Sequence, residues 1–217
     1  MINQISNYLK HYKLRVIGVV ILFYIVGVIG IATFQTLFIA LFPFALVLSF
    51  LAMLLYDSSV FSGRAITGFT LIFIGSLILE IIGVNTHQIF GSYSYDEALG
   101  FKIFNTPLLI GLNWVMLVYS SASLVQRLMG DNWLSVLVAS VLMVVYDLVL
   151  EQVAPLLKMW SWDQGVVPFK NYLDWFIIAF LFQTILKLMK IKSNNDVASV
   201  IFVCQFVFFV AILILIK

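Results

Sequence analysis

Seven stretches of predominantly apolar residues run along this chain, each close to the ~20 residues that cross a bilayer as a helix. Of the 217 residues, 63% are hydrophobic and only 10% are charged, and the mean hydropathy is +1.11. This pattern predicts an all-α fold, a polytopic membrane helix bundle of about seven transmembrane helices, in a single integral membrane domain over residues 1–217. The predicted segments are residues 16–33, 37–56, 65–84, 107–127, 133–154, 171–188 and 197–216. Candidate N-terminal caps are Thr106 for the fourth segment, Asp131 or Asn132 for the fifth, and the run Ser193-Asn194-Asn195-Asp196 for the seventh.

The distribution of Lys and Arg between the predicted loops indicates an orientation in the cell membrane. With a cytoplasmic N-terminus, the inner side holds eight basic residues and the outer side holds four. The inner set is Lys10, Lys13, Arg15, Arg64, Arg127, Lys187, Lys190 and Lys192, and the outer set is Lys102, Lys158, Lys170 and Lys217. We therefore predict a cytoplasmic N-terminus, with the two long loops, residues 84–106 and 155–170, on the outer face.

The composition excludes several classes of function. A net charge of +2 provides no electrostatic footprint for nucleic acid. Two His residues and the single Cys204, which lies in an apolar run, make neither a transition-metal site nor an internal disulfide. A retinal-type receptor would need a lysine near the middle of its last helix, where this chain has none. We expect no metal, no cofactor and no nucleic-acid partner.

Four carboxylates lie inside or at the edge of apolar segments: Glu80, Asp147, Glu151 and Asp174. Insertion of an acidic side chain into hydrocarbon costs about 2.5–3.5 kcal/mol, so each is a candidate functional group. All four lie near the segment ends beneath the long loops, and Asn113 lies at a similar depth. We predict a site in the outer half of the bilayer.

Asp147 and Glu151 are four residues apart and share one face of a helix. Two carboxylates close together in a poorly hydrated place do not both ionise readily, so we expect one proton to be shared. A protonated acid beside a carboxylate suits general acid and base catalysis. Structural alternatives stay open: Asp174 with Asn171 as a helix cap, Glu80 paired with His87, Asn85 or Asn113, a purely structural hydrogen-bond role for Asp147 and Glu151, and Asn113 as a helix–helix contact.

Two blocks of sequence resemble the carotenoid hydratase family often called CruF, including its bisanhydrobacterioruberin hydratase-like members. The first block comprises Glu80-Ile-Ile-Gly83, Phe90-Gly-Ser-Tyr93-Ser-Tyr95, Ala98-Leu99-Gly100, Thr106-Pro107 and Asn113-Trp114. The second comprises Asp147-Leu-Val-Leu-Glu151-Gln-Val-Ala-Pro155, Trp160-Ser-Trp162, Val167-Pro168 and Asn171-Tyr172-Leu-Asp-Trp175. The resemblance covers residues 80–175, within a family-like core of about 65–190. It departs from the family pattern at His87, Gln152 and Asp174.

The resemblance implies a cofactor-independent hydro-lyase. The reaction would add water to the terminal isopropylidene double bond of an acyclic carotenoid end, γ-carotene-like, lycopene-like or longer. The partners would be a carotenoid in the bilayer and water, and other membrane enzymes of the carotenoid pathway are compatible neighbours. We take Glu80, Asp147 and Glu151 as the catalytic candidates. The substrate-binding candidates are Tyr93, Tyr95, Asn113, Trp114, Trp160, Trp162, Asn171, Asp174 and Trp175.

Two other classes of function stay open from the sequence. A carotenoid or terpenoid cyclase or isomerase would also begin by protonating an alkene, but its product would keep the mass of the substrate. A carotenoid-binding or proton-coupled transport protein would also need buried acids or aromatic residues, and would return its ligand unchanged. The aromatic residues of the outer loops are also typical of an ordinary interfacial belt.

Overall fold

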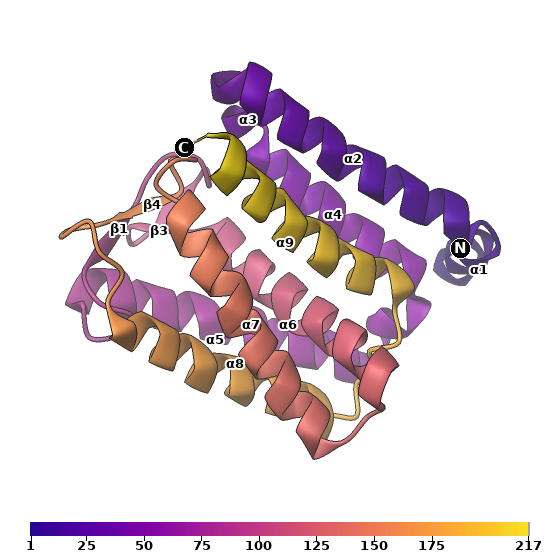
Figure 1. Cartoon of the computed structure of the whole chain (residues 1–217). Helices are drawn as coiled ribbons and strands as arrows, with labels where there is room; N and C mark the ends of the chain where they lie inside the picture. Colours follow the sequence, from indigo (N-terminus) through magenta and orange to yellow (C-terminus); the bar gives the residue numbers. More distant parts are fainter. Residues whose placement is uncertain (217) are drawn as a thin grey trace.

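The computed structural model describes residues 1–216, so Lys217, which entered the orientation prediction, lies outside the described residues. The chain is a bundle of α-helices with four very short strands, which confirms the predicted all-α helix bundle (Figure 1). The helices are α1 (Ile2–His11), α2 (Lys13–Thr33), α3 (Gln35–Ala40), α4 (Phe42–Tyr56), α5 (Gly63–Thr86), α6 (Leu108–Met129), α7 (Trp133–Val153), α8 (Phe169–Leu188) and α9 (Asp196–Leu215), with a 3-10 turn at Ser58–Phe61. The strands are β1 (Tyr93–Tyr95), β2 (Lys102–Ile103), β3 (Thr106–Pro107) and β4 (Trp160–Trp162).

Six of the helices, α2 and α5 to α9, are long and apolar enough to cross a membrane. The remaining predicted segment, residues 37–56, is divided at Leu41 into α3 and α4. Pro43 lies in the first turn of α4, where its missing N–H breaks no helical hydrogen bond. The two termini lie at opposite ends of the bundle (Figure 1). The number of crossings and the cytoplasmic N-terminus stay predictions.

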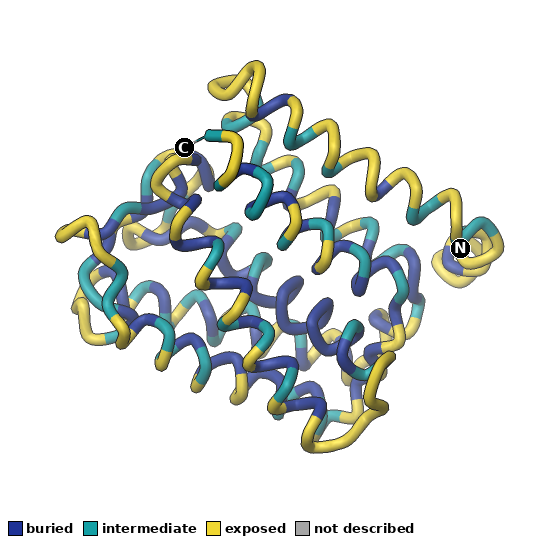
Figure 2. Tube along the Cα trace, in the orientation of Figure 1, coloured by how far each residue is buried: buried dark blue, intermediate teal, exposed yellow. Residues whose placement is uncertain are grey.

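Helix α6 is the central helix and packs against α4, α5, α7, α8 and α9. Every residue from Trp114 to Ser123 is buried, and α6 forms the dark interior of Figure 2. The run Ser120-Ser121-Ala122-Ser123 allows this because small side chains let neighbouring helices approach closely. The Ser121 and Ser123 hydroxyls donate back to carbonyls one turn earlier, at 2.7 and 2.8 Å, so they are satisfied inside the bundle.

The helix ends agree with the predicted caps at two places and differ at two others. Asn132 caps α7 in a capping box with Ser135, and Asn195 caps α9. Helix α8 instead begins at Phe169 after Pro168, so the interpretation of Asn171 and Asp174 as a capping pair is wrong. Thr106 is likewise not a cap, because it lies in β3 and α6 begins two residues later.

The two long loops meet at one end of the bundle, where the strands lie (Figure 1). Strand β1 pairs antiparallel with β4, and β2 with β3. The β2–β3 hairpin turns through Phe104 and Asn105, both with positive φ, as a type I′ turn requires. Loop residues 84–106 are therefore joined by backbone hydrogen bonds to a loop that follows α7.

Candidate functional site

Strands β1 and β4 carry four buried aromatic side chains on one face. Their register pairs Tyr93 with Trp162 and Tyr95 with Trp160, with two serines paired between them. Successive side chains of a strand point to opposite faces, so the tyrosines and tryptophans share a face and the serines take the other. The Tyr93–Trp162 and Tyr95–Trp160 ring centroids are 5.3 and 5.9 Å apart. We call this two-stranded sheet, residues 93–95 and 160–162, the aromatic clasp.

The backbone between α5 and β1 turns back sharply, which brings the clasp over the end of α5. His87 ends α5 in the left-handed conformation, with φ 59°, and Phe90 follows with φ 66°. Gly91 has φ 132°, and a Cβ there would lie 2.7 Å from Pro168 and 3.1 Å from the Trp162 ring. Glycine is therefore required at the point where the loop passes beneath β4.

Glu80 lies on α5 and accepts hydrogen bonds from three side chains. The Tyr93 and Tyr95 hydroxyls donate to Oε2 at 2.6 and 2.7 Å, and the Trp114 indole Nε1 donates to Oε1 at 2.9 Å. Both carboxyl oxygens are thus occupied by donors from β1 and α6. The alternative pairing of Glu80 with His87 or Asn85 is wrong, because these two side chains bond within the loop instead.

The pKa values of the two phenols of the clasp, Tyr93 and Tyr95, are raised by their surroundings. Burial, and then the neighbouring Glu80 carboxyl, raises the pKa of both Tyr93 and Tyr95 well above its usual range. Both hydroxyls therefore remain hydrogen-bond donors at any physiological pH.

Glu151 lies on α7 and accepts from the other strand of the clasp. The indole Nε1 groups of Trp160 and Trp162 donate to Oε2 at 3.0 and 2.7 Å. The register thus places donors to Glu80 directly opposite donors to Glu151. The clasp holds both carboxyl groups, although they come from different helices.

Asp147 lies one turn deeper on α7 and is joined to Glu151 by Asn171 of α8. The Asn171 amide donates to Asp147 Oδ2 at 2.8 Å and lies 3.4 Å from Glu151 Oε1. Asp147 is fully buried, and its Oδ1 has no hydrogen-bond partner among residues 1–216. Within the same residues, no salt bridge reaches Glu80, Asp147 or Glu151.

Glu80 and Glu151 open into one cavity whose other wall residues are aromatic or apolar, apart from Asn113 and Asn171. The volume open to the centre of a water molecule is about 20 Å³, which is room for about one water. Asp147 does not line this cavity. The lining residues are Glu80, Phe90, Tyr93, Tyr95, Ile110, Asn113, Trp114, Leu150, Glu151, Trp160, Trp162, Asn171 and Trp175.

Trp114 and Trp175 stack against each other in the cavity wall, with centroids 4.3 Å apart and planes 28° apart. Asn113 lines the same wall and makes no side-chain hydrogen bond to the described chain. Among the substrate-binding candidates, Asp174 alone lies apart from this cavity. It pairs with Lys170 and accepts the Phe90 backbone N–H at 2.7 Å, so it holds the loop against α8.

Sequence reasoning missed three residues of the cavity wall: Phe90, Ile110 and Leu150. Apolar side chains are common in a membrane protein, so residue type did not separate these three from lipid-facing positions. Within residues 1–216, no group of three His, Cys, Asp or Glu side chains is close enough to hold a metal ion. The polar groups that remain are suited to moving a proton at a small, largely apolar cavity.

Comparisons with known proteins identify the family. No curated protein and no solved structure matches the chain significantly. The family model described as "Carotenoid biosynthesis protein" matches residues 41–217, which include every helix and strand that contributes to the cavity. The chain therefore belongs to the carotenoid biosynthesis protein family, and is a multi-pass membrane protein of that family.

Proposed function

We propose that this protein is a carotenoid hydratase, which adds water to the terminal isopropylidene double bond of an acyclic carotenoid end to give a tertiary alcohol. One observation carries the proposal. Two carboxyl groups without a cationic partner in the described chain, Glu80 and Glu151, face one aromatic-walled cavity with room for about one water. A carbon–carbon double bond is a weak base, so its hydration needs a true acid, a base and a single water in a poorly hydrated place.

The hydrogen-bond donors suggest a role for each carboxyl group. Three donors surround Glu80, an arrangement that suits a carboxylate ready to accept a proton from water. Glu151 shares Asn171 with Asp147, whose second oxygen is unpartnered, so this pair suits a shared proton. Glu151 is then the general acid and Glu80 the general base. Asp147, which does not line the cavity, is a positioning residue.

The atoms balance without another reactant. Glu151 gives its proton to the less substituted alkene carbon, which forms a C–H bond and leaves a tertiary cation. The oxygen of water bonds to the cationic carbon, and Glu80 takes the proton that this water loses. Transfer of that proton back to Glu151 restores the starting state. The electron-rich faces of Trp114, Trp160 and Trp175 in the cavity wall would stabilise the cation.

Location supports the same reaction. An extended carotenoid approximately matches the thickness of the hydrocarbon core, so its end reaches an interface where water is available. Under the predicted orientation, the cavity lies in the outer half of the bilayer. A carotenoid cyclase or isomerase would begin with the same protonation, but its cavity would need to exclude the water that this one has room for.

Expression in a bacterial host that accumulates lycopene and γ-carotene, followed by chromatography and mass analysis of the pigments, tests the proposal. We expect a new, more polar pigment heavier by one water, which is lost or strongly reduced in Asp147→Asn. A product of unchanged mass would replace the hydratase with a cyclase or isomerase. Unchanged pigments with the protein inserted in the membrane would overturn the hydratase and favour the binding or transport function.

A further inference from the structure

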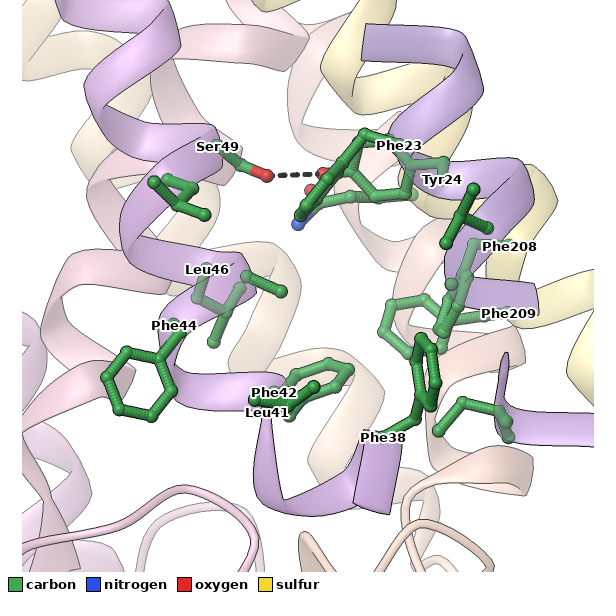
Figure 3. Close-up of a pocket in the computed structure, with 16 residues that line it drawn as sticks. Phe23, Tyr24, Phe38, Leu41, Phe42, Phe44, Leu46, Ser49, Phe208 and Phe209 are labelled. Carbon is green, nitrogen blue, oxygen red and sulfur yellow. Dashed lines mark hydrogen bonds between the residues drawn. The ribbon is translucent and has the colours of Figure 1, made fainter. Parts of the chain in front are cut away.

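An apolar groove between α2 and α4 is much larger than the cavity lined by Glu80 and Glu151, which we call the acid cavity (Figure 3). Its volume open to the centre of a water molecule is about 220 Å³. Six phenylalanines line it: Phe23 from α2, Phe38 from α3, Phe42 and Phe44 from α4, and Phe208 and Phe209 from α9. Its polar groups are few, and two of them, Tyr24 and Ser49, hydrogen-bond to each other at 3.0 Å.

A small middle cavity of about 20 Å³ lies between the groove and the acid cavity. Four residues line both the groove and the middle cavity: Phe42, Leu46, Gln205 and Phe209. Four others line both the middle cavity and the acid cavity: Ile110, Asn113, Leu150 and Trp160. The three hollows therefore lie in a row, separated by shared side chains, from the flank of the bundle to Glu80 and Glu151, and we refer to this row as the tract. We call the middle cavity the throat.

The groove also continues away from the throat, past the Tyr24–Ser49 pair. A second apolar hollow of about 160 Å³ shares Phe23, Tyr24, Leu48 and Ser49 with the groove and reaches Val19. From Val19 to Ile31, α2 rises roughly 18 Å at ~1.5 Å per residue. This is the shape that a long, stiff hydrocarbon chain requires, rather than a compact ligand.

Gln205 is a buried polar group in the wall of the tract. Its side chain is only 3% exposed and lines both the groove and the throat. Its amide oxygen is buried and has no hydrogen-bond partner among residues 1–216. Buried polar groups are normally paired, so an O–H donor that enters or leaves along the tract would satisfy it.

We propose that the groove between α2 and α4 holds the polyene chain of the substrate, which enters sideways from the lipid, and that the side chains around the throat and the acid cavity move apart to admit one end of the chain to Glu80 and Glu151. This inference rests on the proposed function and adds to it the binding site of the substrate's polyene chain. The groove then selects long apolar chains, whereas the acid cavity recognises only the isopropylidene end.

Ala45→Trp tests the proposal, because Ala45 lines the groove and lines neither the throat nor the acid cavity. Val47→Trp is the matched control, because Val47 is on the same helix, is 36% exposed and does not line the groove. The first readout is lycopene retained by the purified protein in a Glu151→Gln background. We expect Ala45→Trp to lower retention about tenfold relative to Val47→Trp, which corresponds to about 1.4 kcal/mol. Equal lycopene retention by Ala45→Trp and Val47→Trp would overturn the proposed binding of the polyene in the groove.

The second readout is turnover with two alkenes, lycopene and myrcene, a short hydrocarbon with the same isopropylidene end. We expect Ala45→Trp to lose lycopene hydration and keep myrcene hydration, whereas loss of both would show damage to the acid cavity and contradict the inference. Ala45→Leu gives a smaller loss if the tryptophan variant does not fold. If the wild type forms no hydrated product but Ala45→Trp still lowers lycopene retention, the proposed hydratase activity is overturned and the proposed binding of lycopene in the groove is supported.

Discussion

Tyr93 and Trp162 are direct partners across the β1–β4 ladder, yet they donate hydrogen bonds to two different carboxyl groups. The Tyr93 hydroxyl donates to Glu80 and the Trp162 indole donates to Glu151, at 2.6 and 2.7 Å. One pair of residues therefore couples the end of α5 to the end of α7. The separation of the two acids is set by a rigid sheet rather than by flexible loops, which suits a reaction that passes a proton from one acid to the other.

Glu151→Gln should remove the proton donor and preserve the fold. The amide has nearly the same size as the acid, but it cannot supply a proton to the alkene. We expect hydrated product to fall by about 10²–10⁴-fold, the usual contribution of general acid catalysis. Glu97→Gln is the matched control, because Glu97 is exposed on the loop outside the cavity. The pigment assay measures both variants, and near-normal product from Glu151→Gln would remove this residue from the mechanism.

The clasp tyrosines should ionise only when the fold is lost. Because burial and Glu80 raise the pKa of Tyr93 and Tyr95 above the unfolded value of about 10, the folded chain keeps protons that the unfolded chain loses. Their stabilisation is fully present below about pH 10 and is lost as the pH rises toward the folded-state pKa values. Alkaline titration followed by tyrosinate absorbance and helical circular dichroism measures this.

The matched variants separate the buried from the exposed phenols in that titration. Tyr93→Phe with Tyr95→Phe should leave the absorbance change near pH 10 unaltered and reduce the later phase that accompanies loss of helix. Tyr8→Phe is the control substitution, because Tyr8 lies outside the clasp and is 63% exposed. A smaller early phase in the double variant would show that the clasp tyrosines titrate normally.

Asn171→Ala should destabilise the protein and slow turnover together. It removes the amide shared by Asp147 and Glu151, at 2.8 and 3.4 Å. Loss of a hydrogen bond to a buried carboxyl group lowers the free energy of unfolding by about 1.5–3 kcal/mol. Thermal unfolding in detergent measures the change, with Asn194→Ala as the control on an exposed amide. A wild-type Tm in Asn171→Ala would mean that the two acids need no bridge.

Gln205→Leu should stabilise the protein. Burial of the unpartnered Gln205 amide costs about 1–3 kcal/mol, which leucine would relieve, so the Tm should rise. Gln183→Leu is the contrasting control, because the Gln183 amide donates to the Val118 carbonyl and the Ser121 hydroxyl, and its loss should lower the Tm. A lower Tm in Gln205→Leu would show that this amide is already satisfied.

The membrane class and the candidate acids could be predicted from sequence for the same reason. The free energy of moving a residue into hydrocarbon depends mainly on its own type and its neighbours in the chain, so the apolar segments and the carboxyl groups within them are visible locally. Glu80, Asp147 and Glu151 were identified in this way. The same local signals predicted the caps Asn132 and Asn195.

The tertiary structure decided which of these groups work together. Asp147 and Glu151 share a helix face, yet only Glu151 reaches the cavity, because Asn171 and the packing of α8 on α7 lie over Asp147. Asp174 has the residue type of a site acid but is held by Lys170 and the Phe90 backbone.

The clasp, the throat and the break between α3 and α4 also could not be predicted from local sequence patterns. The sequence alone determined that acids would be buried near the ends of a membrane helix bundle. Four of the donors to Glu80 and Glu151 come from strands that pair across a separation of more than sixty residues, Tyr95 with Trp160 and Tyr93 with Trp162. That pairing depends on the backbone path through positive-φ residues such as Phe90 and Gly91, and on the space that the packed helices leave. Neither this backbone path nor the space between the packed helices is a property of any single segment of the chain.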